Sequence, residues 1–112
     1  MSQFNQLPEF TKEFAKLAKK YKSLPRDLAD LEILLRANPV GFGTNFVTLH
    51  HSEVLRIVKT RLACKSLRER SLRVVYAYHA NRIEFMYIEV YFKGAKANEN
   101  RERIAEYIKS NL

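Results

Sequence analysis

Residues 72–92 constrain the fold more than any other segment, because they read as two β-strands joined by a short turn. Both halves are rich in Val, Ile, Tyr and Phe, the residue types that favour strands. The predicted strands are Leu72–His79 and Ile83–Phe92, with the turn near Ala80-Asn81. An isolated hairpin is at best marginally stable in water, so other strands or helices must pack against this one.

Two helices are predicted at the start of the chain, where apolar residues recur at three- and four-residue steps. The first follows Pro8, a residue type that suits the first turn of a helix. The second begins after Ser23, the expected N-cap, and ends at Asn38-Pro39, because the residue before a proline disfavours helical geometry. With so short a connection, two amphipathic helices are expected to form a helical hairpin.

The remaining predicted elements are two further strands and a final helix. Strand-forming residues recur in Phe46–His50 and Val54–Leu62. Asn98 is expected to cap a helix that begins at Glu99 and ends near Asn111. This order predicts an α+β fold: an N-terminal helical hairpin packed on a small, mainly antiparallel sheet of three or four strands, with a C-terminal helix and the helices on one face.

The length and the charge balance limit the kinds of partner. The 112 residues suit one domain, 1–112, with a single modest core. Lys and Arg number 20 against 12 Asp and Glu, a formal net charge of +8 that favours anionic partners such as nucleic acid or acidic proteins. The single cysteine, Cys64, can form no internal disulfide, and no signal peptide or run of 18 apolar residues is visible. We therefore expect a cytoplasmic protein with no membrane association.

The loop length in the hairpin decides which residues share a face, because strand side chains alternate. A three-residue loop over 80–82 gives the clearest separation of apolar and charged residues between the two faces. It pairs His79 with Ile83 and Arg73 with Glu89. The face expected against the helices carries Val74, Tyr76, Met86, Ile88 and Val90. The opposite face is expected to carry Arg73, Val75, Ala77, His79, Phe85, Tyr87, Glu89, Tyr91 and Lys93.

The preceding strand adds Lys59 and Arg61, which alternate together. If it lies beside the Leu72 strand, these two residues extend a basic and aromatic surface with Arg73, Lys93 and the tyrosines of the hairpin. Guanidinium and ammonium groups suit phosphate, and tyrosine rings offer stacking faces for unpaired bases. The alternative is a solvated sheet face whose charges pair across strands. Both interpretations remain open from the spacing alone.

Several segments resemble the RelE/ParE superfamily of toxins from bacterial and archaeal toxin–antitoxin pairs. The resemblance covers most of the chain and rests on KKYKSLPRDLADLEILLRANP, VLRIVKTRLA, LRVVYAYH and IEFMYIEVYFKG. Its most specific part is RVVY, residues 73–76, combined with the Phe92-Lys93 pair that closes the next strand. The resemblance implies a RelE-like toxin that cleaves messenger RNA, commonly on the ribosome, and that a cognate antitoxin neutralises.

Within this family, basic residues on the central strands hold the scissile phosphate. The resemblance carries that role to Lys59, Arg61, Arg73 and Lys93. The reaction needs no metal or other cofactor, and its base would be Lys59 or Glu89, although Glu89 would alternatively hold Arg73 in place. The candidate RNA-contacting residues are Lys65, Arg68, Tyr87, Tyr91 and His79, with His79 expected on the surface at the hairpin tip. Tyr107 is a possible acid or base, but its position suits packing equally well.

Two other functions remain open. A ParE-like toxin would bind and inhibit DNA gyrase and cleave nothing. A degenerate member would bind RNA without toxicity, and two departures from active RelE-type sequences keep this alternative open: Ser71-Leu72 ahead of the strand arginine, and Gly94 after Lys93. The sequence has no HExxH, CxxC or glycine-rich phosphate loop, which argues against zinc hydrolases and nucleotide-driven enzymes.

Overall fold

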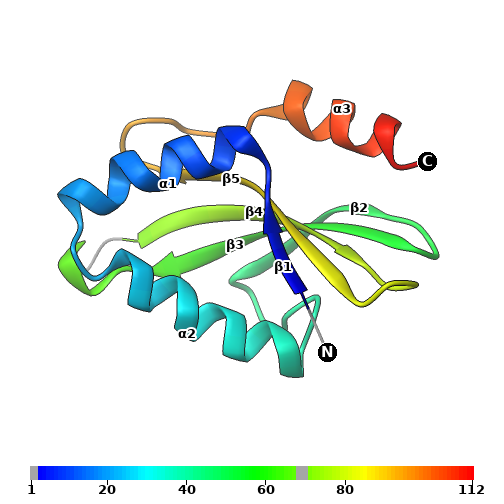
Figure 1. The fold of residues 1–112 in the computed structure, drawn as a ribbon, viewed down its shortest axis with the longest axis horizontal. Helices are drawn as coiled ribbons and strands as arrows, with labels where there is room; N and C mark the ends of the chain where they lie inside the picture. Colours follow the sequence, from blue (N-terminus) through cyan, green and yellow to red (C-terminus); the bar gives the residue numbers. More distant parts are fainter. Residues whose placement is uncertain (1–2, 68–70) are drawn as a thin grey trace.

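The computed structural model describes residues 3–67 and 71–112. Figure 1 shows these residues as an α+β fold, which confirms the predicted fold class. The elements are, in chain order, β1 (Gln3–Gln6), α1 (Pro8–Lys20), α2 (Leu24–Ala37), β2 (Phe46–His51), β3 (Leu55–Ala63), the 3₁₀ helix η1 (Lys65–Leu67), β4 (Ser71–His79), β5 (Glu84–Phe92) and α3 (Arg101–Ser110). None of the helices within the described ranges has the length and apolar character needed to cross a membrane.

The sheet has one more strand than the sequence predicted. In the described residues it is five-stranded, with the order β1-β5-β4-β3-β2, so β4 lies at its centre. The additional strand β1 pairs parallel to β5, and the other pairings are antiparallel. It escaped the sequence analysis because Gln3–Gln6 contains one apolar residue, Phe4. Long-range packing compensates for that, because the Phe4 ring stacks on Phe85 with centroids 4.3 Å apart.

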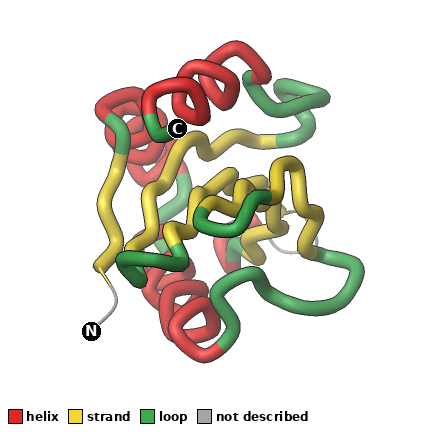
Figure 2. Tube along the Cα trace, turned by 90° about the vertical axis from the view of Figure 1, so that its right-hand side faces the viewer, coloured by secondary structure: helices red, strands yellow, loops and turns green. Residues whose placement is uncertain are grey.

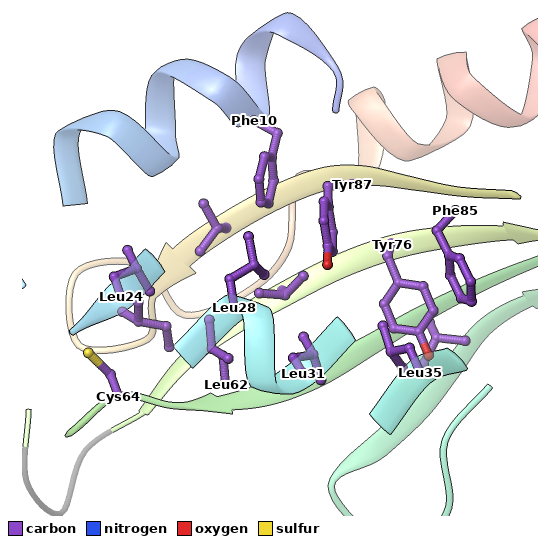
Figure 3. Close-up of a cluster of buried hydrophobic side chains, with 14 of the residues drawn as sticks. Phe10, Leu24, Leu28, Leu31, Leu35, Leu62, Cys64, Tyr76, Phe85 and Tyr87 are labelled. Carbon is purple, nitrogen blue, oxygen red and sulfur yellow. The ribbon is translucent and has the colours of Figure 1, made fainter. Parts of the chain in front are cut away.

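The helical hairpin covers one face of the sheet and forms the larger core with it. Phe10 of α1 and Leu24 and Leu35 of α2 are fully buried there, against Tyr76 and Tyr87 of the sheet (Figure 3). Burial of each such side chain contributes about 1.5–3 kcal/mol. This packing explains the apolar periodicity of the first two helices, because each turns its apolar stripe to the strands.

The third helix packs on the opposite face, which corrects the expectation that all helices share one face. Ile104 and Tyr107 of α3 pack with Ile57 and Val75 in a second, smaller core. In the side view of Figure 2, the sheet accordingly runs between α2 and α3. The helix cap also differs from the prediction, because the side chain of Asn100, not Asn98, accepts a hydrogen bond from the Arg103 backbone N–H at 3.1 Å.

The β4–β5 hairpin has a different register from the predicted one. His79 pairs with Glu84, not with Ile83, because the loop has four residues and Ile83 adopts a left-handed φ of +54°. Further along, Tyr76 pairs with Tyr87 but Val75 pairs with Glu89, so a β-bulge inserts one residue into β5. Bulges interrupt side-chain alternation.

The four-residue loop places the part of β5 before the bulge on the face opposite the one predicted, and the bulge restores the predicted face beyond it. Phe85 and Tyr87 lie in the core under the helical hairpin, and Met86 and Ile88 face α3. Beyond the bulge, Val90 packs under the helical hairpin as predicted. Simple alternation along the whole strand was therefore wrong before the bulge and correct after it.

Candidate functional site

A cleft of about 210 Å³ brings together four cationic side chains that the sequence analysis selected. Its walls come from the loop before β2, from β2, β3 and β4, and from the residue after β5. The lining residues are Thr44, Asn45, Val47, Lys59, Thr60, Arg61, Arg73 and Lys93. We call this the cationic cleft.

Strand register explains why these side chains meet. Arg61 of β3 pairs with Arg73 of β4, which in turn pairs with Tyr91 of β5. Lys59 lies two residues before Arg61 on β3, so both point to the face that α3 partly covers. The predicted neighbourhood of β3 and β4 is thus confirmed. The loop before β2 closes the cleft, because the Asn45 carbonyl accepts a hydrogen bond from the Arg61 N–H at 3.2 Å.

A carboxylate that the sequence analysis missed lies beside this cleft. The Lys59 ammonium donates a hydrogen bond to Glu99 Oε1 at 2.9 Å, and Arg101 Nε lies 3.8 Å from the other carboxylate oxygen. The hydrogen bond from Lys59 holds the pKa of Glu99 below its ordinary value, although partial burial acts in the opposite direction. The Glu99 side chain is only 8% exposed. No local pattern connects residues forty positions apart, so the sequence offered no signal for this pair.

Tyr91 lies in the middle of these charged groups. Burial, together with the nearby carboxylates of Glu99 and Glu89, raises the pKa of Tyr91 to about 12, while Arg73 acts in the opposite direction. The Lys96 ammonium lies 5.3 Å from the centre of its ring. Tyr91 is buried, so its ring is not the open stacking face that the sequence analysis expected.

Glu89 has a different setting from the one predicted. It pairs across the strands with Val75, not with Arg73, because the longer loop and the bulge each shift the register by one residue. Its fully buried carboxylate accepts hydrogen bonds from the Asn100 backbone N–H at 2.7 Å and from the Lys96 ammonium. Glu89 therefore anchors the chain that leads into α3, with both oxygens occupied.

Two predicted RNA contacts lie inside the protein. His79 is not on the surface, because α3 covers it and its Nε2 is hydrogen-bonded to the Tyr107 hydroxyl. Tyr87 is fully buried, and its hydroxyl donates to Glu32 at 2.9 Å. Neither ring can stack on a nucleotide without unfolding its surroundings. Tyr107, bonded to His79, packs in the smaller core and is absent from the residues that line the cationic cleft.

The two remaining candidates do not line the cationic cleft as described. Lys65 is exposed in η1 and lines a separate cleft next to α2, and its backbone N–H donates to Asp27. Arg68 lies outside the described residues. Across residues 3–67 and 71–112, no three side chains of His, Cys, Asp or Glu are grouped closely enough to hold a metal ion.

No model of a known protein family matches this sequence, and no functionally curated protein matches it. A solved structure does: a chain in the crystal structure of the archaeal RelE–RelB complex from Pyrococcus horikoshii OT3. The match has a TM-score of 0.64 at 16% sequence identity and covers 83% of this chain and 96% of that chain. At this identity the match establishes the fold alone, and the chain accordingly has a RelE-like fold.

Proposed function

We propose that this protein is the toxin of a type II toxin–antitoxin pair and acts as a metal-independent endoribonuclease on messenger RNA, with the ribosome as its setting. The observation that carries this proposal is the convergence of Lys59, Arg61, Arg73 and Lys93 on one cleft of a RelE-like fold. Four cations in about 210 Å³ make a strong electrostatic site for a phosphodiester.

The chemistry suits such a cleft. In metal-independent cleavage, the ribose 2′-hydroxyl attacks the adjacent phosphorus, and negative charge builds on the phosphoryl oxygens in the transition state. Arg61 and Arg73 occupy paired positions on neighbouring strands, and Lys93 follows β5 directly, so the three residues line one cleft. The proposal assigns Arg73 and Lys93 to stabilising that charge, with Arg61 as a third clamp on the phosphate.

The proposed partner is a cognate antitoxin. The structure with the matching fold is a complex of RelE with RelB, and a chain with a formal net charge of +8 attracts acidic segments. An acidic or amphipathic segment, disordered before it binds, would neutralise the cationic cleft and cover neighbouring apolar grooves.

Induced expression in bacteria, with growth and the 5′ ends of messenger RNA followed together, tests the nuclease. We compare the wild type with the double variant Arg73→Ala/Lys93→Ala. The control is Lys16→Ala/Lys19→Ala, which removes two exposed charges from α1. Removal of groups that stabilise transition-state charge typically costs about 100-fold or more in rate, so the cleft variant should lose both arrest and cleavage. The control should keep both.

The other outcomes identify the alternative functions. Growth arrest without messenger-RNA cleavage, accompanied by loss of gyrase supercoiling, would indicate a gyrase inhibitor and contradict the nuclease. No arrest by a well-folded wild type would indicate a member that only binds. The double variant is checked for folding by its circular dichroism and thermal midpoint, so that loss of toxicity is not confused with loss of structure.

A further inference from the structure

The Lys59–Glu99 ion pair lies on the border between two clefts. Lys59 lines the cationic cleft, and Glu99 lines a second cleft of about 300 Å³ between β2 and α3. Apolar residues, Leu49, Ile104 and Ile108, form most of the walls of this second cleft, which we call the apolar cleft. Since the two side chains touch at 2.9 Å, a ligand that filled both clefts would pass directly over the pair.

The proposed reaction needs a proton acceptor, and the cationic cleft does not hold one. Its described lining residues are cationic, neutral polar or apolar. Glu89, the carboxylate that the sequence suggested, has both oxygens occupied in the interior. Lys59 acts as a hydrogen-bond donor to the Glu99 carboxylate.

We propose that Glu99 is the catalytic proton acceptor for the ribose 2′-hydroxyl, with Lys59 holding its carboxylate at the border of the two clefts. This role rests on the proposed ribonuclease function and adds to it a residue from outside the cationic cleft. With the scissile phosphate on Arg61, Arg73 and Lys93, the preceding nucleoside lies toward the apolar cleft, and its 2′-hydroxyl lies at the border.

The proposed step balances without any co-reactant. The 2′ O–H bond breaks, its proton passes to the Glu99 carboxylate, and the 2′ oxygen forms a bond to phosphorus. The bond between phosphorus and the 5′ oxygen breaks, and that oxygen takes a proton from the Lys93 ammonium. The products are a 2′,3′-cyclic phosphate and a 5′-hydroxyl, and exchange with water restores the protonation of Glu99 and Lys93.

The charges around Glu99 keep it ionised and make its basicity depend on the substrate. Lys59 of β3 and Arg101 stabilise the carboxylate, and the Tyr91 hydroxyl of β5 also interacts with it. A bound phosphate competes for the Lys59 ammonium. Sharing Lys59 with the phosphate weakens its hydrogen bond to Glu99 without breaking it, so the carboxylate stays in place and becomes a stronger base when the 2′-hydroxyl arrives.

The experiment separates binding from cleavage. Purified wild type, Glu99→Gln and Glu102→Gln are given a short RNA, free and in the ribosomal A site, and the same RNA with a 2′-deoxy sugar at the scissile position. Glu102 is exposed in the first turn of α3, three residues after Glu99, and serves as the charge-matched control. Glu99→Gln should cleave about 100-fold more slowly and bind the 2′-deoxy RNA as the wild type does, because general-base catalysis contributes about 10²–10⁴-fold. Glu102→Gln should match the wild type in both.

A second measurement uses the wild type alone and does not depend on any variant folding. With Glu99 as the base, the cleavage rate of free RNA is level between about pH 5 and 7 and falls at lower pH as the carboxylate is protonated. With neutral Lys59 as the base, the rate rises about tenfold per pH unit over the same range.

Each outcome has a distinct meaning. A slow Glu99→Gln with intact binding, and a level wild-type profile, support the assignment. Equal cleavage by Glu99→Gln and the wild type, or a rate that rises through neutral pH, overturns Glu99 and leaves the ribonuclease standing. Parallel loss of binding and cleavage overturns the catalytic role in favour of a structural one. If the wild type cleaves the unmodified RNA neither free nor in the ribosomal A site, the proposed ribonuclease function is contradicted, and the role of Glu99 is contradicted with it.

Discussion

His79 illustrates, at the scale of one residue, how a covering element changes the chemistry of a side chain. Near the tip of a hairpin it would be an ordinary surface histidine, but α3 buries it against Tyr107. Burial, the largest cause, lowers the pKa of His79. The charge of Arg82 also lowers it, while Glu84 acts in the opposite direction. The neutral imidazole is therefore the form that the folded protein prefers.

This burial predicts a pH-dependent stability. The unfolded chain protonates His79 as the pH falls through its ordinary value of 6.5, whereas the folded protein resists protonation until a lower pH. The unfolded state thus binds more protons, so His79 lowers the free energy of unfolding progressively below about pH 6.5. Urea unfolding at pH 7 and pH 5 should show a smaller difference between the two pH values in His79→Gln than in the wild type.

The carboxylates that titrate between pH 7 and pH 5 contribute equally to the wild type and to His79→Gln. The difference in pH dependence between these two proteins is therefore due to His79. His51→Gln, an exposed substitution on β2, is the matched control and should keep the wild-type pH dependence. An unchanged pH dependence in His79→Gln would contradict the assigned burial.

At the scale of elements, the Arg103–Glu13 ion pair between α3 and α1 forms hydrogen bonds with the backbone at the edge of β5. Among the described residues, the short strand β1 pairs with Glu84 to Tyr87 and ends there, so no described strand pairs with the later part of β5 on that side. There the Arg103 guanidinium donates to the Ile88 carbonyl at 2.8 Å and to both oxygens of Glu13, and Glu13 accepts from the Val90 N–H. Helices α1 and α3, which lie on opposite faces, are thereby joined around the sheet edge.

Removal of this guanidinium should destabilise the fold more than its position in a polar helix suggests. Arg103→Met removes the guanidinium donors to the Ile88 carbonyl and to the Glu13 carboxylate, and we expect a loss of about 1–3 kcal/mol in the free energy of unfolding. Arg101→Met is the control on the same helix. Its side chain is 82% exposed, so a change within about 0.5 kcal/mol is expected. Equal effects of the two variants in urea unfolding would show that the edge contact contributes little.

At the scale of the whole molecule, the positive charge is spread beyond the cationic cleft. Lys12, Lys16 and Lys19 are exposed along α1, which packs on the face of the sheet opposite α3. Charges of this kind raise the rate at which a polyanion approaches without taking part in chemistry. The net charge of +8 therefore includes two sets of residues: the cations of the cationic cleft, which the catalytic proposal uses, and the exposed lysines of α1, which it does not.

A triple variant distinguishes these two sets. Lys12→Gln/Lys16→Gln/Lys19→Gln should weaken RNA binding at low salt and leave the cleavage rate at saturating RNA unchanged. Arg61→Ala should instead lower the slope of log affinity against log salt by about 0.7, the contribution of one phosphate contact on a single strand. Titrations of fluorescent RNA at several salt concentrations give the affinity at low salt and the slope of log affinity against log salt. A triple variant that cleaves slowly at saturation would place the reaction elsewhere than the cationic cleft.

Much of this molecule follows from local pattern. The helices from Pro8 and after Ser23, the strand with Lys59 and Arg61, and its neighbourhood to the Arg73 strand could all be predicted, because periodicity and β-propensity act over a few residues. The basic side chains of the cleft followed from the same alternation, joined to the family resemblance.

The tertiary structure decided the rest. The four-residue loop reversed the faces of Tyr87 and Ile88, and the bulge in β5 restored the predicted face of Val90, because neither the longer loop nor the bulge has a signature in the local pattern. Packing of α3 on the second face buried His79, and the chain before that helix delivered Glu99 to Lys59. The His79–Tyr107 and Lys59–Glu99 contacts join residues about thirty to forty positions apart. They form because burial and charge pairing depend on distance in space, and the spacing of residues along the sequence does not reveal that distance.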